Sequence, residues 1–243
     1  LDDCTNLQFL DISWFSQYLP IPSINHLHKL QTLILRSFFS LKELPIIDKL
    51  QSLTSLDIND CSQIEYIHLP YLEKLHILEA NGCSSLQRLD ISNTSHLKKL
   101  SLARAAELIE IIGLSVNSSL ESLLLTGANE LLSLEGLSNN SNLKQLQIND
   151  CYSLQELPSF QALKLLQSLQ IYGCPNLQEL KEIEVLPSLS ILQLGGCRSL
   201  KTIPDLKNLP ALEELTLSWF HNDVQMINLS NLSRLKKLKL SGH

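Results

Sequence analysis

The chain has 243 residues, of which 19 are lysine or arginine and 25 are aspartate or glutamate, so its formal net charge is −6. That balance argues against a nucleic-acid-binding protein, which normally carries a basic stripe. Leucine is by far the most frequent residue, whereas aromatic residues make up only 5%. Because an irregular core needs side chains of varied shape, this leucine excess predicts one packing position that is used many times. No apolar run reaches the roughly 18–20 residues of a membrane span, so we expect no membrane insertion.

One pattern, L-x-x-L-x-(L/I/A), recurs through the whole sequence at a nearly constant interval. The first leucines of its eleven copies are Leu7, Leu30, Leu53, Leu75, Leu97, Leu120, Leu143, Leu166, Leu189, Leu212 and Leu235. A fixed period of this length is the signature of a repeat architecture in which each unit stacks on its neighbours.

Within a repeat, apolar and polar residues alternate over 143–148, which is typical of a strand with one buried face. Leu154 and Leu157 then turn the chain inward again, and Pro158 disfavours a regular helix on the return path. The sequence therefore predicts an α/β leucine-rich-repeat solenoid of about eleven 22–23-residue repeats. In this open horseshoe a parallel β-sheet lines the concave face, and irregular or 3-10 turns form the convex face. We expect residues 1–243 to form a single domain, an uncapped fragment of a longer protein.

Five of the six cysteines share one repeat position, eight residues after the first leucine of the repeat. They are Cys61, Cys83, Cys151, Cys174 and Cys197. Other repeats place alanine or phenylalanine there, which indicates a packing position. Neighbouring repeats are close enough for disulfides, but we expect reduced, buried thiols and hence a reducing compartment. The sequence contains no C-x-x-C pair, the spacing that would suggest a zinc site.

The repeat consensus, L-x-x-L-x-L-x-x-C-x-x-L-x-x-L-P, is most complete over Leu143–Pro158 and Leu189–Pro204. It resembles the repeats of plant intracellular nucleotide-binding leucine-rich-repeat (NLR) immune receptors. The resemblance implies a cytoplasmic sensor of a pathogen effector or a guarded host protein. It also implies that the repeats restrain the receptor's own upstream nucleotide-binding domain. The Leu/Ile-Pro step is clear only at Pro45, Pro158 and Pro204, which leaves the subfamily open.

Three alternatives remain. The repeats could belong to the substrate receptor of an F-box ubiquitin ligase, although the repeats of those receptors are longer and usually carry a second cysteine. They could also belong to a repeat scaffold that has no switching role. Five N-x-S/T sequons give a secreted receptor some support, although a chain rich in asparagine and serine forms sequons by chance. The sequons begin at Asn93, Asn117, Asn139, Asn228 and Asn231.

The predicted register assigns the residues between the strand leucines to the concave face. Asp57 and Glu79 oppose each other on neighbouring strands, with Asp60 close by, so this acidic group invites a basic partner. The alternative is that the long side chains splay into water. Exposed aromatic, large aliphatic and arginine side chains are typical anchors of protein interfaces. Trp14 and Trp219 share one repeat position and could instead cap the ends of the stack. The candidate partner-binding residues are Phe9, Trp14, Ile34, Arg36, Asp57, Asp60, Glu79, Arg104, Leu124, Tyr172 and Trp219.

Motifs of catalysis and cofactor binding are missing from the sequence. It contains no phosphate-binding G-x-x-x-x-G-K-(S/T) loop, no G-x-S-x-G and no H-E-x-x-H. The seven histidines lack metal-ligand spacing. We therefore expect a protein that is not an enzyme, with no catalytic residue, cofactor or metal, whose partners are proteins.

Overall fold

The computed structural model describes residues 1–14, 21–202, 205–218 and 229–242. Its long sheet contains β1 (Phe9–Asp11), β2 (Thr32–Ile34), β3 (Ser55–Asp57), β5 (Ile77–Glu79), β7 (Lys99–Ala103), β9 (Ser122–Thr126), β10 (Gln145–Asn149), β11 (Ser168–Tyr172), β12 (Ile191–Gly195), β13 (Glu214–Ser218) and β14 (Lys237–Ser241). The shorter elements are β4 (Tyr66–His68), β6 (Arg88–Asp90), β8 (Glu110–Ile112) and the 3-10 helices η1 (Leu114–Val116), η2 (Leu137–Asn139), η3 (Ile183–Val185) and η4 (Leu206–Asn208).

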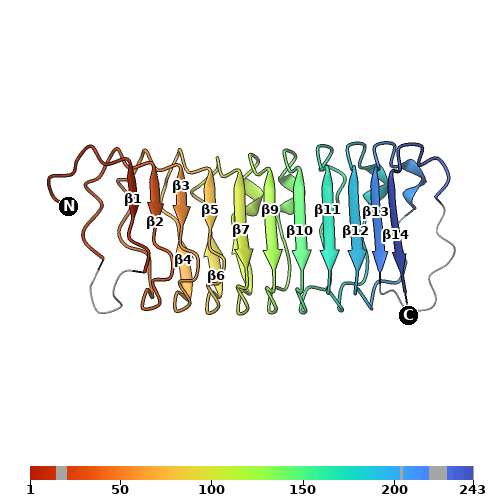
Figure 1. Ribbon diagram of the computed structural model, residues 1–243, viewed down its shortest axis with the longest axis horizontal. Coiled ribbons are helices and arrows are strands. Elements are labelled where there is room, and N and C mark those ends of the chain that lie inside the picture. Colours follow the sequence, from red (N-terminus) through yellow and green to blue (C-terminus); the bar gives the residue numbers. More distant parts are fainter. Residues whose placement is uncertain (15–20, 203–204, 219–228, 243) are drawn as a thin grey trace.

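The long sheet is parallel, and each strand pairs with the strand one repeat away, which gives eleven strands in chain order. Figure 1 shows these arrows side by side along the long axis. The register follows the repeat, because Leu146 of β10 lies opposite Leu123 of β9 and Leu169 of β11. The predicted solenoid and its eleven repeats are confirmed. We call each repeat a rung, and the solvent-facing side of the long sheet the concave face.

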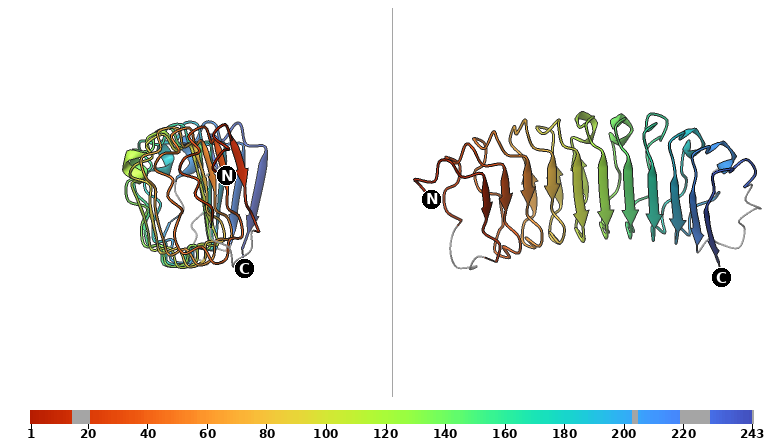
Figure 2. Two further views of the ribbon diagram at one scale, coloured as in Figure 1. Left: turned by 90° about the vertical axis from the view of Figure 1, so that its left-hand side faces the viewer. Right: turned by 45° about the horizontal axis from the view of Figure 1, so that its top comes forward.

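The return half of each rung closes the coil on the side opposite the long sheet, as the end-on view of Figure 2 shows. In the part of the chain that the structure describes, its helices are the four short 3-10 helices, so the helical share of the expected α/β repeat is small. The strands β4, β6 and β8 pair into a second parallel sheet that the sequence did not predict. Each has a buried central residue between two more exposed ones. Pro158 occupies the position equivalent to Ile112 and lacks the N–H that such a ladder needs.

The recurring apolar residues form one continuous core that runs from Leu10 to Leu217. Leu123, Leu146 and Leu169 are all buried, and each packs on the same side chain of the next rung. Burial of one leucine side chain contributes about 1.5–3 kcal/mol. Because every rung buries apolar side chains at the same positions, each added rung stabilises the stack by about the same amount. The leucine excess therefore reflects one packing position repeated along the solenoid.

The five cysteines of the shared position are buried and free, whereas Cys4 is exposed. The Cys61 thiol donates to the Leu35 carbonyl oxygen at 3.1 Å, and the Cys83 thiol to that of Ile58 at 3.3 Å. These two thiols thus satisfy backbone acceptors of the preceding rung, whereas those of Cys151 and Cys197 donate to carbonyl oxygens of their own rung. Burial raises the pKa of Cys61 to about 11 and that of Cys83 to about 12.

Thiol reactivity should separate Cys4 from the other five cysteines. Only the thiolate attacks a disulfide reagent, and burial blocks access to all five thiols. Burial also opposes ionisation, although hydrogen bonding with Cys174 lowers the pKa of Cys151. We expect a chromogenic disulfide reagent at pH 8 to titrate one thiol rapidly in the native chain and all six in denaturant. The Cys4→Ser variant should lose the fast phase alone. Several fast thiols in the native wild-type chain would contradict this packing.

Two buried asparagines cross-link neighbouring rungs on the return side. The Asn117 amide donates to the Ile91 carbonyl oxygen at 3.1 Å and to that of Gly113 at 2.9 Å. The Asn140 amide, one rung on, donates to the Leu114 and Gly136 carbonyl oxygens at 3.0 and 3.1 Å. Asn117 heads one of the five sequons, and it has no exposed surface. It therefore cannot carry a glycan in the folded chain, whereas the sequon asparagines Asn93, Asn139 and Asn231 are exposed.

Candidate functional site: the concave face

Three residues of each rung point out of the long sheet, and the middle one forms a column along the solenoid. From β1 to β14 this central column reads Asp11, Ile34, Asp57, Glu79, Ser101, Leu124, Gln147, Gln170, Gln193, Thr216 and Lys239. The inward leucines repeat, whereas this column changes chemistry along the stack. Its charged members lie toward the two ends, and the residues between Glu79 and Lys239 are uncharged.

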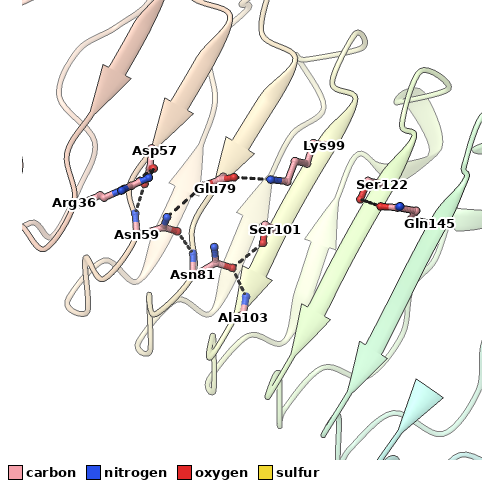
Figure 3. A network of polar contacts seen from close by, with 10 residues as sticks. All are labelled: Arg36, Asp57, Asn59, Glu79, Asn81, Lys99, Ser101, Ala103, Ser122 and Gln145. Carbon is pink, nitrogen blue, oxygen red and sulfur yellow. Dashed lines mark hydrogen bonds and ion pairs between the residues drawn. The ribbon is translucent and has the colours of Figure 1, made fainter. Parts of the chain in front are cut away.

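Asp57 is paired within the chain. The Arg36 guanidinium, one rung away, lies 2.5 Å (Nη2) and 2.7 Å (Nε) from its Oδ2 atom. Its other oxygen, Oδ1, accepts the Asn59 backbone N–H at 3.0 Å. Only 5% of Asp57 is exposed, so this carboxylate is enclosed by its own partners. Figure 3 shows Arg36 and Asn59 on either side of it.

Glu79 has a cation of its own as well. The Lys99 ammonium donates to its Oε1 atom at 2.6 Å, and the Asn59 amide reaches Oε2 at 3.4 Å. Asn81 continues the network to the next rung, because its Oδ1 atom accepts from the Ser101 hydroxyl at 2.8 Å and from the Ala103 N–H at 2.7 Å. The polar contacts in Figure 3 thus run without a break from Arg36 to β7.

These contacts give the acidic group cations of its own, and partner contact by Asp57, Asp60 and Glu79 stays a prediction. Asp57 and Glu79 do lie opposite each other, as expected. However, Arg36, Lys99 and Arg104 neutralise Asp57, Glu79 and Asp60 in turn. The sequence pattern did not reveal the cations of Asp57 and Glu79 because Arg36 and Lys99 sit in different repeat positions from the acids that they pair with. Arg104 shares the repeat position of Asp60 but lies two rungs away. The acidic group thus cross-links neighbouring rungs, and Asp57 is the most enclosed of its three carboxylates.

The pH dependence of stability should report the Glu79–Lys99 pair. The hydrogen bond from Lys99 lowers the pKa of Glu79 below its ordinary value of 4.5, against an opposing effect of burial. A carboxylate whose pKa is depressed by folding adds stability above its unfolded pKa, and that stability is lost as the pH falls through the folded pKa. We expect an NMR titration of Glu79 to give a pKa below 4.5 in the wild type and a higher one in Lys99→Met. The Lys144→Met control, which removes the partner of Glu121, should leave Glu79 unchanged. Identical Glu79 curves in all three chains would refute the assignment.

A second cross-link lies in the turns that follow the strands, between Asp60 and Arg104. In nine rungs the residue before the cysteine position has a positive φ, from Trp14 to Gly196. The Asp60 carboxylate there accepts from Arg104 at 2.9 Å, although the two residues lie two rungs apart. Gly82 occupies the rung between them, and a Cβ atom at Gly82 would stand 2.1 Å from the Asp60 Oδ1 atom. The pair therefore requires glycine at this turn.

The predicted aromatic and aliphatic anchors near β1 are present at the surface. Phe9 is 57% exposed and Trp14 is 74% exposed, and Trp14 packs edge-on against Phe39 with 6.2 Å between the ring centroids. Ile34 is partly exposed on the same face. Trp219 lies outside the described residues, so its role as an anchor or a cap stays a prediction. Partner contact by Phe9, Trp14 and Ile34 stays a prediction as well.

The middle of the concave face carries no charge. On β9, β10, β11 and β12 every outward residue is uncharged, and glutamines stand at positions 145, 147, 170 and 193. Leu124 is partly exposed among them. Charges return only beyond the strand ends, where Glu121 pairs with Lys144 at 2.7 Å and Asp150 begins the next turn.

Tyr172 lies across this uncharged region instead of projecting from it. A Cβ atom at Gly195, on the next rung, would meet the tyrosine ring at 2.7 and 2.8 Å, so the ring rests on the bare glycine backbone. Burial raises the pKa of Tyr172, and hydrogen bonding to Ser218 and Thr216 partly offsets that rise. The tyrosine thus forms a flat, partly buried platform on the sheet.

Within the described ranges, no cluster of three or more histidine, cysteine, aspartate or glutamate side chains could hold a metal ion. None of the helices there has the length and hydropathy of a membrane span. The concave face therefore remains the candidate site.

Comparison with known proteins agrees with this geometry. Residues 126–197 match the family model described as R13L1/DRL21 LRRs, where LRR stands for leucine-rich repeat. The chain has the leucine-rich-repeat fold. A leucine-rich-repeat protein of Leptospira interrogans has a similar fold, with a TM-score of 0.55 and 22% identity over 99% of this chain and 74% of that one. No curated protein sequence matches this leucine-rich-repeat domain.

Two further solved structures share the leucine-rich-repeat fold. The functional domain of InlJ from Listeria monocytogenes, which includes a cysteine ladder, gives a TM-score of 0.51 at 18% identity over 97% of this chain. The present domain spans 63% of that chain's length. The leucine-rich-repeat domain of the type III effector XopL gives a TM-score of 0.51 at 20% identity, over 86% of this chain and 76% of that one.

Proposed function

We propose that this leucine-rich-repeat domain is the protein-recognition domain of a plant NLR immune receptor. One observation carries the recognition role: the inward positions of the long sheet repeat, whereas the outward positions change from rung to rung. A scaffold that holds a varied row of side chains at fixed spacing is suited to reading an extended protein surface. The consensus over Leu143–Pro158 supports the receptor class by resemblance.

The domain would act by binding alone, without catalysis or a cofactor. An effector or a guarded host protein on the concave face would favour the active receptor only through a higher affinity for that state. Contacts between the repeats and the upstream nucleotide-binding domain would favour the resting state. The five buried, free thiols support a cytoplasmic location, since reducing compartments preserve such thiols.

The coding sequence upstream of Leu1 tests the receptor class. A phosphate-loop ATPase module there supports the proposal. An F-box would overturn it in favour of a ubiquitin-ligase substrate receptor, and a chain with neither module would point to a scaffold.

Concave-face recognition is tested in the intact receptor. Leu124→Lys adds a charge to the uncharged middle of the face, and we expect a weaker response to the cognate effector. Gln178→Lys adds the same charge to an exposed position of the return side and should leave the response unchanged. Equal responses from both variants would remove the concave face from the binding surface.

A further inference from the structure

The uncharged middle of the concave face has unused hydrogen-bonding capacity. Gln147 donates once, to the Thr126 hydroxyl at 3.3 Å, and Gln170 donates once, to the Ser168 hydroxyl at 3.5 Å. The Gln193 side chain has no hydrogen bond to any described residue. Because each primary amide offers two donor hydrogens and an acceptor oxygen, the three glutamines present a row of free donors and acceptors. Such a row is suited to a ligand that brings both kinds of group, as a polypeptide backbone does.

Charge restricts that ligand further. Beside this surface Lys99 pairs with Glu79 and Lys237 with Glu214. Lys239, the one charged residue of the central column beyond the glutamines, lies two rungs from Gln193. A charged ligand side chain placed over the glutamines would therefore lose water without gaining a counterion, which is costly. The surface selects a segment without charged residues.

The spacing of the rungs restricts the conformation of the bound segment. Adjacent rungs lie about 4.8 Å apart, so Gln147 and Gln193 are separated by about 9.6 Å. A polyproline II helix advances about 3.1 Å per residue and repeats every three residues, that is, every ~9.3 Å. An extended β-strand repeats every two residues, at about 6.7 Å, and falls out of phase with the rungs. A polyproline II segment also leaves its backbone groups unpaired and free to bond the glutamines.

Tyr172 adds an apolar contact at the same place. Its ring lies flat over Gly195 and borders the glutamine column, next to Gln170 on its own strand. Aromatic platforms of this kind bind proline-rich polyproline II segments in other recognition modules. The preformed conformation of such a segment also reduces the entropy lost on binding.

We propose that the surface formed by Leu124, Gln147, Gln170, Tyr172 and Gln193 binds an uncharged peptide segment in the polyproline II conformation, laid along the solenoid axis. From Ser101 to Thr216 the uncharged column covers five rung intervals, about 24 Å, which corresponds to about eight residues of such a segment. This inference rests on the proposed recognition role of the concave face and specifies the partner that its middle would take.

The test sorts a displayed library of random peptides of about 12 residues on the full chain, long enough to cover the column. We expect the bound pool to be depleted of aspartate, glutamate, lysine and arginine and enriched in proline at three-residue spacing. A synthetic peptide from that pool should bind the Gln147→Glu/Gln193→Glu variant at least about tenfold more weakly, because the added charges lie buried and unpaired beneath it. The control variant Gln155→Glu/Gln178→Glu carries the same charges on the return side and should bind like the wild type. Circular dichroism confirms that both variants are folded.

Other outcomes overturn the inference in distinguishable ways. Enriched peptides that carry charges, yet lose affinity when Leu124 or Phe9 is substituted, would refute the uncharged segment and leave concave-face recognition intact. Peptides insensitive to every concave substitution would count against both. A library without enriched peptides would refute this inference alone. A neutral oligosaccharide that binds on a glycan array, and is lost in Gln147→Glu/Gln193→Glu, would replace the peptide with a glycan.

Discussion

Replacement of Leu146 by aspartate is expected to unfold the rungs around β10. Leu146 is 1% exposed at the centre of the long sheet, between Leu123 and Leu169. The substitution removes the leucine contacts, which costs about 2–5 kcal/mol, and places a carboxylate where no cation can reach it. The free energy of unfolding should fall by at least about 5 kcal/mol, with a matching drop in the melting temperature measured by circular dichroism.

Hydrogen exchange should localise that damage. In a solenoid each rung contacts only its neighbours, so amides of β9–β11 should lose protection while those of β3 and β5 keep most of theirs. Gln145→Asp is the matched control, because it places the same side chain at an exposed position of the same strand. If Leu146→Asp and Gln145→Asp melted at the same temperature, the inward register of the repeat would be wrong.

The double variant Asp57→Lys/Glu79→Lys should also destabilise the chain strongly. If these carboxylates only splayed into water, reversing them would change partner binding and leave the melting temperature nearly constant. The structure reverses that expectation, because the new lysines would face Arg36 and Lys99 across an enclosed part of the network. The carboxylates are largely enclosed, but the Arg36 and Lys99 side chains are 50% and 40% exposed, so solvent screens part of the repulsion. We expect a cost of about 2–4 kcal/mol and a fall in melting temperature of roughly 5–10 °C.

An exposed ion pair provides the comparison. Glu213→Lys breaks the Lys236 pair, whose side chains are 39% and 70% exposed, and should cost less than about 1 kcal/mol. Adding Arg36→Glu to Asp57→Lys restores an opposite-charge pair and should recover part of the loss. A double variant as stable as Glu213→Lys would show that the network contributes little to stability.

The fold could be predicted from the sequence because every rung needs apolar side chains at the same repeat positions. The nearly constant spacing of the leucines fixes the strand register, and Leu146 is buried for the same reason as Leu123. The short strands β4, β6 and β8 escaped prediction. Their pattern of one buried residue between two exposed ones is too brief to distinguish from a turn.

The concave face was predictable in position and only partly in chemistry. The sequence placed Asp57 opposite Glu79, but not the cations that neutralise them, because Arg36 and Lys99 occupy other repeat positions. The asparagines that join the network, Asn59 and Asn81, follow the central column by two residues on consecutive rungs. This repeated asparagine was the one feature of the sequence that could have indicated the polar network. The flat placement of Tyr172 needed the structure, since it depends on Gly195 one rung away.

The ion pair that passes over Gly82 bears on how such a chain can change in length. Asp60 and Arg104 are two rung steps apart, about 10 Å, and a repeat gained between them would separate them by about 14 Å, beyond reach of a direct contact. Tyr172 on β11 likewise reaches past Gly195 of β12 to Ser218 and Thr216 on β13. Among the described residues, β9 and β10 have side-chain contacts only with neighbouring rungs, so unequal recombination could duplicate one of these two and keep every neighbour matched. Gains and losses of repeats should therefore be tolerated there and selected against between Asp60 and Arg104 and between Tyr172 and Ser218. The surface that we assign to ligand binding is thus free to vary in extent at its Leu124–Gln147 end.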